Sequence, residues 1–338
     1  MSPWQLVYYT QTRRGNGDMR HVIGIDAGGT ATRAVLLDET GRCLGYGRAG
    51  AGNPTSAGEH LAMSNQLAAT LAAIGDSAVA PDVVMLTLAG GLGTQIAPMV
   101  TEALAGAGLT AEVHVVGDVM SAYFSATAEP TGYLVLSGTG AISARIVDGV
   151  LDGLADGIGW LLGDEGSGFW IGNRVVRAVA AALEGRGPQT ALTGLVLAQV
   201  DDETPQEEEP RRPEVWKVMS RVYRRRPVEC AEFAPLAFAA AATGDAVATS
   251  ILEGALAGLL TSCGALIADD DRPIVLAGGL LYDGSPLSDG LRARYPGRCL
   301  RASEGTAGAA LLALRAIDAP ADASTLARIH ETLAPLIG

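Results

Sequence analysis

Lysine is almost absent from this chain of 338 residues: of the 24 basic side chains, only Lys217 is a lysine. The P-loop motif and the protein-kinase VAIK strand, which both need a lysine, are missing, and Lys217 lies in neither pattern. Cysteine and histidine are also scarce, with four of each, and no C-x-x-C pair occurs. We therefore expect neither a disulfide framework nor a zinc knuckle, and we expect a reducing, cytoplasmic compartment.

An excess of positive charge and long apolar runs are lacking as well. Acidic residues number 37, which gives a formal net charge of −13. Proteins that coat nucleic acid need clustered Lys and Arg, so no DNA or RNA partner is expected. The longest uncharged stretch, residues 83–101, is broken by glycines and Pro98 and predicts a strand, a turn and a helix, not a membrane span. Residues 1–20 lack a signal-peptide pattern; we interpret them as a disordered leader or the product of a start codon placed too far upstream.

Glycine, by contrast, is abundant, with 44 residues, and much of that excess is typical of coding bias. Three glycine turns nevertheless follow predicted strands, at residues 28–30, 138–140 and 278–279. Backbone N–H groups in such turns can bind phosphate without a cationic side chain. An ordinary hairpin turn explains any one of them, but two matching turns and a third together favour a phosphate-binding function.

Strands and helices are predicted to alternate in the first part of the chain. We expect three strands over 21–48, a helix over 57–75, a strand from 83, a helix over 94–108, and a strand at 112–118 that runs into a helix. This alternation predicts an α/β domain with a largely buried sheet. Residues 133–149 then repeat the plan of residues 21–41, with Gly138-Thr139 aligned to Gly29-Thr30. The repeat predicts a duplicated, two-lobed fold with one glycine turn from each lobe facing a common cleft.

The rest of the chain is predicted to be mostly helical. Helices are expected over 173–184, 214–223, 231–243, 245–267, 305–317 and 322–335, with one strand near 272–281. The acidic stretch 201–213 reads as a solvated loop or insertion. We predict a leader at 1–20, an N-terminal lobe at 21–130 completed by a C-terminal helix at 318–338, and a C-terminal lobe at 131–317.

Carboxylates stand at three informative places. Asp26 ends the first strand beside a glycine turn, where it can hold Mg²⁺ next to phosphates. Asp118 stands between a strand and a helix, either as a helix N-cap or as a general base for an attacking hydroxyl. Asp164 and Glu165 lie in the glycine-rich segment 157–172, which is either a capped loop entering a helix or a site for sugar hydroxyls.

These segments, in this order, resemble the ASKHA superfamily of sugar kinases, Hsp70 and actin-like ATPases. They are most similar to its branch of N-acetylglucosamine kinases and BadF/BadG/BcrA/BcrD-type ATPases. The segments that carry the resemblance are GIDAGGTATRAVLLD (24–38), GDVMSAY (117–123), LSGTGAIS (136–143), GWLLGDEGSGFWIG (159–172), VLAGGLL (275–281) and GAALLAL (308–314).

The resemblance implies a two-lobed actin-like ATPase (ribonuclease H-like) α/β fold, with duplicated βββαβα lobes and a central cleft. It also implies ATP- and Mg²⁺-dependent phosphorylation of an amino sugar, N-acetylglucosamine or glucosamine, at the 6-hydroxyl, with N-acetylmuramic acid also possible, by a cytoplasmic homodimer. By position it implies Asp118 as base and substrate contact, Asp26 at the metal, and Asn53, Gly163 and Asp164 at the sugar. The implied nucleotide contacts are Gly28, Gly29, Thr30, Gly138, Thr139, Gly140, Gly278 and Gly279.

Two departures from the pattern bear on the sugar: Ile158 stands where these kinases often have tryptophan, and Ala89 where the mammalian-type enzyme has serine. Two other functions stay open. The first is an ATPase that activates a 2-hydroxyacyl-CoA dehydratase or benzoyl-CoA reductase, although the spaced cysteines offer no obvious iron–sulfur ligand set. The second is a non-catalytic, sugar-responsive regulator, against which the intact Asp26 and Asp118 argue.

Overall fold

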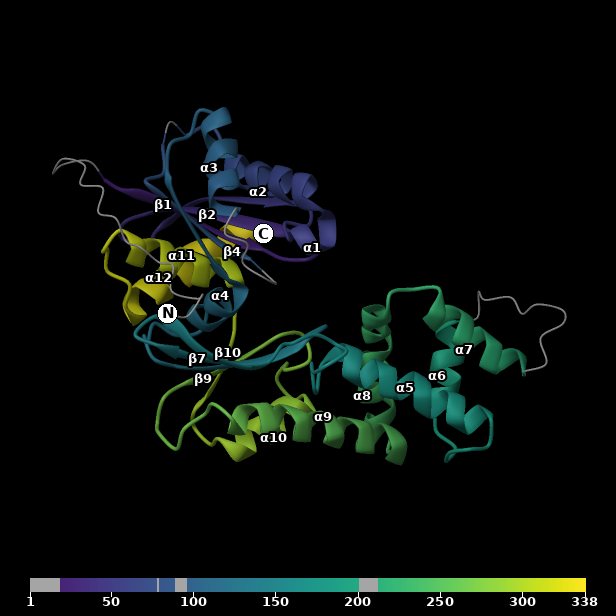
Figure 1. Ribbon diagram of the computed structural model, residues 1–338. Coiled ribbons are helices and arrows are strands. Elements are labelled where there is room, and N and C mark those ends of the chain that lie inside the picture. Colours follow the sequence, from purple (N-terminus) through teal and green to yellow (C-terminus); the bar gives the residue numbers. More distant parts are fainter. Residues whose placement is uncertain (1–18, 78, 89–95, 201–211) are drawn as a thin grey trace. The chain divides into compact units, whose positions relative to one another are not determined.

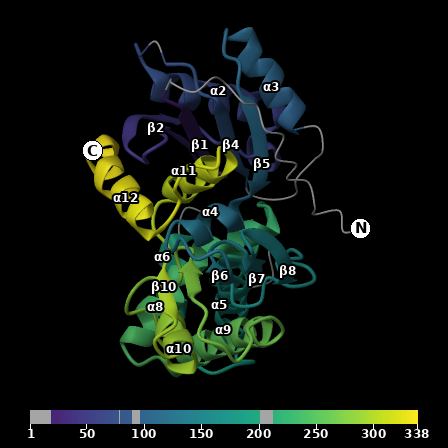
Figure 2. The same cartoon turned by 90° about the vertical axis from the view of Figure 1, so that its left-hand side faces the viewer.

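Two five-stranded sheets with the same strand order form the framework of the computed structural model, which describes residues 19–77, 79–88, 96–200 and 212–338. The first sheet has the order β3-β2-β1-β4-β5, and the second has the order β10-β9-β6-β7-β8. Figure 2 labels four strands of each sheet: β1, β2, β4 and β5, and β6, β7, β8 and β10. Read from β8, the second order repeats the first strand for strand. β1 pairs in parallel with β4, and β6 likewise pairs in parallel with β9. The α/β fold class and the duplication are thus confirmed.

The first sheet is covered by helices on both faces, as the almost continuously buried strands at its centre require. Its strands are β1 (His21–Ala27), β2 (Thr32–Asp38), β3 (Cys43–Ala49), β4 (Val83–Leu88) and β5 (Glu112–Gly117). Its helices are α1 (Pro54–Ala57), α2 (Glu59–Ile74), α3 (Ile96–Gly106), α4 (Asp118–Phe124), α11 (Gly305–Ala316) and α12 (Ala323–Ile337). α2 and α3 cover one face, and α11 and α12 cover the other (Figure 1).

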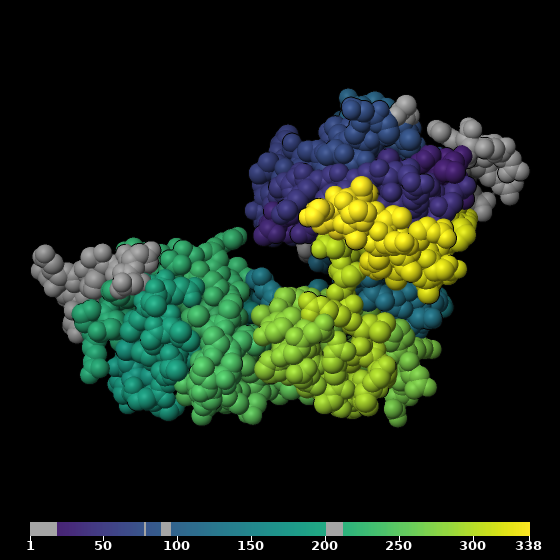
Figure 3. Space-filling model, turned by 180° about the vertical axis from the view of Figure 1, so that it is seen from behind, coloured from purple at the N-terminus to yellow at the C-terminus, as the bar shows by residue number. Residues whose placement is uncertain are grey.

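The two ends of the described chain meet in this unit. The backbone N–H of Cys43 donates to Thr332 Oγ1 at 3.0 Å, and Arg328 donates to the carbonyl of Thr40 at 2.6 Å. Figure 3 shows the C-terminal helix, in yellow, lying against the purple N-terminal strands. Residues 19–77, 79–88, 96–132, 146–151 and 300–338 form this compact unit.

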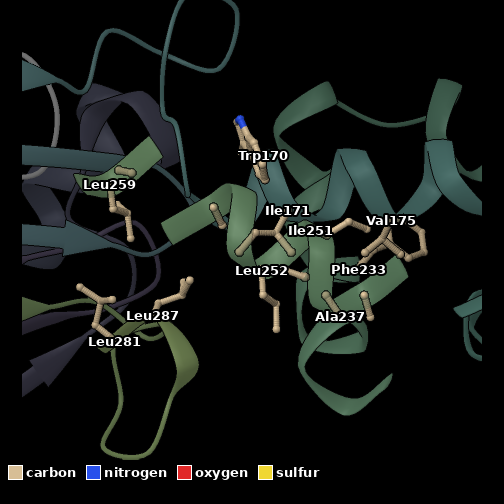
Figure 4. Close-up of a cluster of buried hydrophobic side chains, with 14 of the residues drawn as sticks. Trp170, Ile171, Val175, Phe233, Ala237, Ile251, Leu252, Leu259, Leu281 and Leu287 are labelled. Atoms are coloured by element: carbon tan, nitrogen blue, oxygen red, sulfur yellow. The ribbon is translucent and has the colours of Figure 1, made fainter. Parts of the chain in front are cut away.

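Residues 133–145, 152–200 and 212–299 form the second compact unit. The second sheet comprises β6 (Gly132–Ser137), β7 (Ala141–Val147), β8 (Val150–Asp156), β9 (Ile274–Ala277) and β10 (Cys299–Arg301). The helices are α5 (Gly168–Leu183), α6 (Leu192–Gln199), α7 (Pro213–Tyr223), the 3₁₀ helix η1 (Pro227–Phe233), α8 (Ala234–Ala242), α9 (Ala246–Gly264) and α10 (Pro286–Arg294). Their apolar side chains, among them Ile171, Val175 and Phe233, form one core (Figure 4).

One helix among the described residues, α9, is long and apolar enough to cross a membrane. It also supplies Ile251, Leu252, Ala255, Leu259 and Cys263 to the core of its unit. A single apolar helix that packs in this way is typical of the interior of a folded domain, so α9 is weak evidence for a membrane span.

The predicted helices and strands are largely confirmed, with one clear correction. α5 starts at Gly168, not near residue 173, because the Ser167 hydroxyl caps it by accepting the N–H of Trp170 at 3.1 Å. The sequence patterns missed α1, α6, α10, β8 and β10, and they missed η1 before residue 231. Residues 1–18 of the predicted leader and 201–211 of the predicted acidic insertion lie outside the described residues, and the predicted lobe boundaries stay predictions.

Candidate active site

The first glycine turn joins β1 to β2 and is closed by its own backbone. The N–H of Gly28 donates to the carbonyl of Ala31 at 2.9 Å, and the carbonyl of Gly28 accepts the N–H groups of Gly52 and Asn53 at 3.0 and 3.2 Å. Gly29 and Thr30 at the tip are exposed. The tip is therefore held in place and open to a ligand.

Asp26 lies beside this turn with two charged neighbours, Arg33 and Glu304. Its Oδ2 is 3.8 Å from Nη1 of Arg33, and Nε of Arg33 is 3.8 Å from Oε2 of Glu304. α11 begins directly against the carboxylate, since a Cβ added at Gly305 would lie 2.7 Å from Asp26 Oδ2. Burial raises the pKa of Asp26; Arg33 opposes that rise and Glu304 adds to it. A cation bound at Asp26 would relieve this unfavourable burial of charge.

Asp118 is the first residue of α4, directly after β5, and the N-cap position belongs to Gly117. Asp118 is thus not the N-cap of α4, which excludes one of the two roles that the sequence left open. Burial and the nearby charge of Asp26 raise the pKa of Asp118 to about 6, although backbone hydrogen bonds oppose the rise. A carboxylate with this pKa is mostly ionised at neutral pH and is more basic than an ordinary aspartate, as a general base requires.

Asn53 lies after β3, is joined to the same glycine turn by its backbone N–H, and is buried. Its Oδ1 caps α1 by accepting the N–H of Thr55 at 2.8 Å. Because the cap fixes the side chain through its oxygen, the direction of its NH₂ group is fixed as well.

The second and third glycine turns lie side by side in the second unit. The N–H of Gly138 donates to the carbonyl of Gly140 at 2.9 Å, which closes the second turn much as Gly28 closes the first. The N–H of Leu280 donates to the carbonyl of Ser137 at 3.1 Å and joins the third turn to the second. Gly278 has a φ of 92°, and a Cβ there would overlap the backbone of Ser137. This close approach requires glycine.

Asp164 lies against the second glycine turn. Its Oδ1 accepts the N–H of Ala141 at 3.3 Å, and a Cβ added at Gly140 would lie 3.2 Å from the same oxygen. The side chain is only 8% exposed. Burial raises the pKa of Asp164; the Ala141 N–H opposes the rise, and the charge of Asp156 adds to it.

The predicted site residues thus gather in two groups, one in each unit. Asp26 and Asn53 lie beside the first turn, Asp118 is close enough to Asp26 for that charge to raise its pKa, and Asp164 lies with the other two turns. Sequence reasoning missed Arg33, Glu304 and Asp156. Hairpin symmetry would have found Arg33, because Asp26 and Arg33 stand equally far from the centre of the 29–30 turn and are paired across the hairpin. Among the described residues, no three His, Cys, Asp or Glu side chains gather into a metal site.

Comparisons with known proteins find sugar kinases among the relatives of this chain. The N-acetyl-D-glucosamine kinase of Dictyostelium discoideum is 29% identical over 322 residues, covering 86% of this chain and 97% of that protein. The glucosamine kinase of Vibrio cholerae is 24% identical over 241 residues, covering 70% and 76%. The crystal structure of a candidate N-acetylglucosamine kinase from Chromobacterium violaceum has 28% identity and a TM-score of 0.69, covering 87% of this chain and 99% of that one.

The family itself follows from a match along most of the chain. The model for the BadF/BadG/BcrA/BcrD ATPase family matches residues 23–313, which include all three glycine turns, Asp26, Asp118 and Asp164. The duplicated sheets carry the actin-like ATPase fold of the sugar kinases. By its sequence and its fold, the chain belongs to the BadF/BadG/BcrA/BcrD ATPase family.

Proposed function

We propose that this protein is an ATP-dependent kinase that phosphorylates an amino sugar, N-acetylglucosamine or glucosamine, at the 6-hydroxyl. The observation that carries the proposal is Asp118, a largely buried carboxylate at the start of α4 whose pKa is raised to about 6. Two relatives, similar over most of their length, are kinases of N-acetylglucosamine and glucosamine. Asp118 and these relatives favour phosphoryl transfer over the two alternatives, an activator ATPase and a sugar-responsive regulator.

In the proposed reaction, Asp118 takes the proton of the 6-hydroxyl while that oxygen attacks the γ-phosphorus of ATP. The bond between the γ-phosphorus and the bridging oxygen breaks, and ADP leaves with the electron pair. Catalysis otherwise consists of positioning the reactants and neutralising phosphate charge. A regulator that only senses sugar has no need of a buried carboxylate with a pKa near 6.

The exposed tips of the glycine turns are the proposed phosphate and nucleotide contacts. The proposed donors are the backbone N–H groups that are not already used to close the turns. Asp26 fits Mg²⁺, which is commonly bound through one or two carboxylates, substrate phosphates and water. Mg²⁺ supplies charge neutralisation of the phosphates when bound. Arg33, beside Asp26, is placed to add a fixed positive charge, and it does so without any lysine.

Asn53, Gly163 and Asp164 are the proposed sugar contacts. Asp164→Asn should raise the KM for the sugar by about tenfold, because a charged hydrogen-bond partner of the sugar is lost. The KM for ATP should stay unchanged. Asparagine also tolerates the left-handed backbone at this position, where φ is 57°, so the fold is preserved. Initial rates with sugar and ATP varied separately give both constants, and an unchanged sugar KM contradicts the assignment.

The choice of sugar is testable with one panel. ADP release should be measured with glucosamine, N-acetylglucosamine, N-acetylmannosamine, N-acetylmuramic acid and glucose, with a no-sugar control. Strong release with an amino sugar, and none with its 6-deoxy analogue, is the expected result. ATP hydrolysis at the same rate with and without sugar would favour the activator alternative, and sugar binding without turnover would favour the regulator.

Ile158, one of the two departures from the kinase pattern, is exposed within the glycine-rich segment, while Ala89 lies outside the described residues. Both bear on which sugar is preferred, so the panel includes a bulkier N-acetylmuramic acid. The four cysteines are free thiols, which fits the proposed cytoplasmic location. A homodimer stays a prediction.

A further inference from the structure

One carboxylate holds both ends of the loop that leads from β8 to Asp164. Oδ1 of Asp156 accepts the N–H of Gly157 at 2.8 Å and the N–H of Asp164 at 2.6 Å. Oδ2 of Asp156 accepts the N–H of Glu165 at 2.8 Å. Asp156 therefore closes residues 157–163 into a loop with a common base, which we call the Asp156 clip.

The apolar side chains of this loop do little to fix it. Ile158 is 63% exposed, and Leu161 and Leu162 are each 76% exposed. The Trp160 ring lies against Phe169, with centroids 5.5 Å apart. Because little apolar surface is buried, packing contributes little to the loop's conformation. Within the loop, the carbonyl of Gly159 accepts the N–H groups of Leu162 and Gly163 at 3.1 and 2.9 Å, and the hydrogen bonds at the base join the two ends of the loop.

The backbone at the base of the loop also depends on the clip. Asp156 and Asp164 both adopt the left-handed region, with φ values of 64° and 57°. Residues other than glycine adopt this region rarely and keep it only where their surroundings impose it. Gly163 fits closely beside the clip, since a Cβ there would overlap Oδ1 of Asp156.

We propose that Asp156 is a positioning residue that fixes Asp164 in place for the sugar; this inference rests on the proposed function. The chain of contacts is continuous. Asp156 accepts the N–H of Asp164, and the Asp164 carboxylate in turn accepts the N–H of Ala141 next to the second glycine turn. Loss of the clip frees the backbone that aims the Asp164 carboxylate.

Two substitutions distinguish the effect of the Asp156 carboxylate from the effect of the left-handed backbone at this position. Asp156→Gly keeps the left-handed φ accessible but removes all three acceptors. Asp156→Asn keeps one acceptor oxygen for Gly157 and Asp164 and loses the acceptor for Glu165. We expect the KM for the sugar to rise about tenfold or more in the glycine variant and less in the asparagine variant, with the KM for ATP unchanged in both.

Hydrogen exchange of the ligand-free protein gives a readout that needs no activity. The amides of Gly157, Asp164 and Glu165 should be protected in the wild type, should exchange fastest in Asp156→Gly, and should be partly protected in Asp156→Asn. Asp148→Gly is the matched control. Asp148 is an exposed aspartate with a φ of 49° in the turn between β7 and β8, and its replacement should leave the sugar KM and the loop exchange unchanged.

The outcomes are distinct. Unchanged exchange in Asp156→Gly shows that the clip does not hold the loop, and faster exchange with a wild-type sugar KM shows that it does not position Asp164 for the sugar; either result overturns the inference. A general rise in both KM values, shared by the Asp148 control, points to damaged folding and also counts against it. If the wild type phosphorylates no sugar, the proposed function fails, whereas the exchange data still decide whether Asp156 fixes Asp164.

Discussion

Asp118→Asn should lower kcat by at least about a hundredfold, because the amide cannot take the proton of the attacking hydroxyl. The side chains have the same shape, so ATP should bind with nearly unchanged affinity. Steady-state rates with saturating sugar, together with nucleotide binding by calorimetry, measure both quantities. Asp148→Asn, at an exposed turn, is the control and should keep wild-type kcat. A near-normal rate in Asp118→Asn would reject Asp118 as the base.

The same substitution should stabilise the fold at neutral pH. The pKa of Asp118 rises from 3.8 to about 6 on folding, so the folded protein binds this proton more tightly than the unfolded chain does. The free energy of unfolding therefore falls as pH rises from about 4 to 6, by at most about 3 kcal/mol. Asparagine carries no charge, so the free energy of unfolding of the variant does not fall in this way. Urea denaturation should show Asp118→Asn to be more stable than the wild type at about pH 7, with most of the gain absent at about pH 4.

The raised pKa also predicts the acidic side of the pH–rate profile. A base must be deprotonated to act, so kcat/KM should fall as pH drops through about 6, well above the range of an ordinary aspartate. Initial rates at low substrate concentration give the midpoint. A midpoint near 4 would contradict the environment described for Asp118, in which burial and the charge of Asp26 raise its pKa.

Gly308→Ala should destabilise the protein by about 1–3 kcal/mol and reduce kcat. Alanine usually stabilises a helix relative to glycine, by up to about 1 kcal/mol. At Gly308 in α11, however, a Cβ would overlap the carbonyl of Ser121 in α4, so the two helices must move apart. Ser121 follows Asp118 by one turn of α4, and its displacement moves the base with it.

Gly194→Ala provides the opposite case for comparison. Gly194 lies in α6, and a Cβ there meets nothing within 4 Å. This variant should be as stable as the wild type or up to about 1 kcal/mol more stable, with normal activity. Denaturation of both variants measures the contrast. If Gly308→Ala gained stability in the same way, the close packing of α4 against α11 would be refuted.

The fold was predictable from sequence where its signals are local. The apolar strands around Gly29 and Gly138 predicted both hairpins, and their repetition predicted the duplicated sheets. The start of α5 was misplaced because glycines at 168 and 172 resemble a loop, whereas Gly172 packs tightly on the backbone of Cys230. α6 was missed because its apolar residues show no helical periodicity, and β10 because it has only three residues.

The residues of the candidate site were likewise predictable only where the signal is local in the sequence. Asp26 and Asp118 were identified because Asp26 lies at the end of β1 and Asp118 directly follows β5, a pattern visible in a short window of sequence. The contact of Gly305 with Asp26 joins segments far apart in the chain, and no local pattern indicates it. The role of Asp156 was also hidden, because its side chain bonds backbone groups across a loop and any residue type supplies those groups.

Mass spectrometry of the sugar after incubation with ATP and Mg²⁺ tests the central claim most directly. N-acetylglucosamine or glucosamine should gain one phosphoryl group at the 6-position, in an amount equal to the ADP formed, and Asp118→Asn should yield almost none. ATP consumption that leaves every amino sugar unmodified would contradict the proposal that this protein is an amino-sugar kinase.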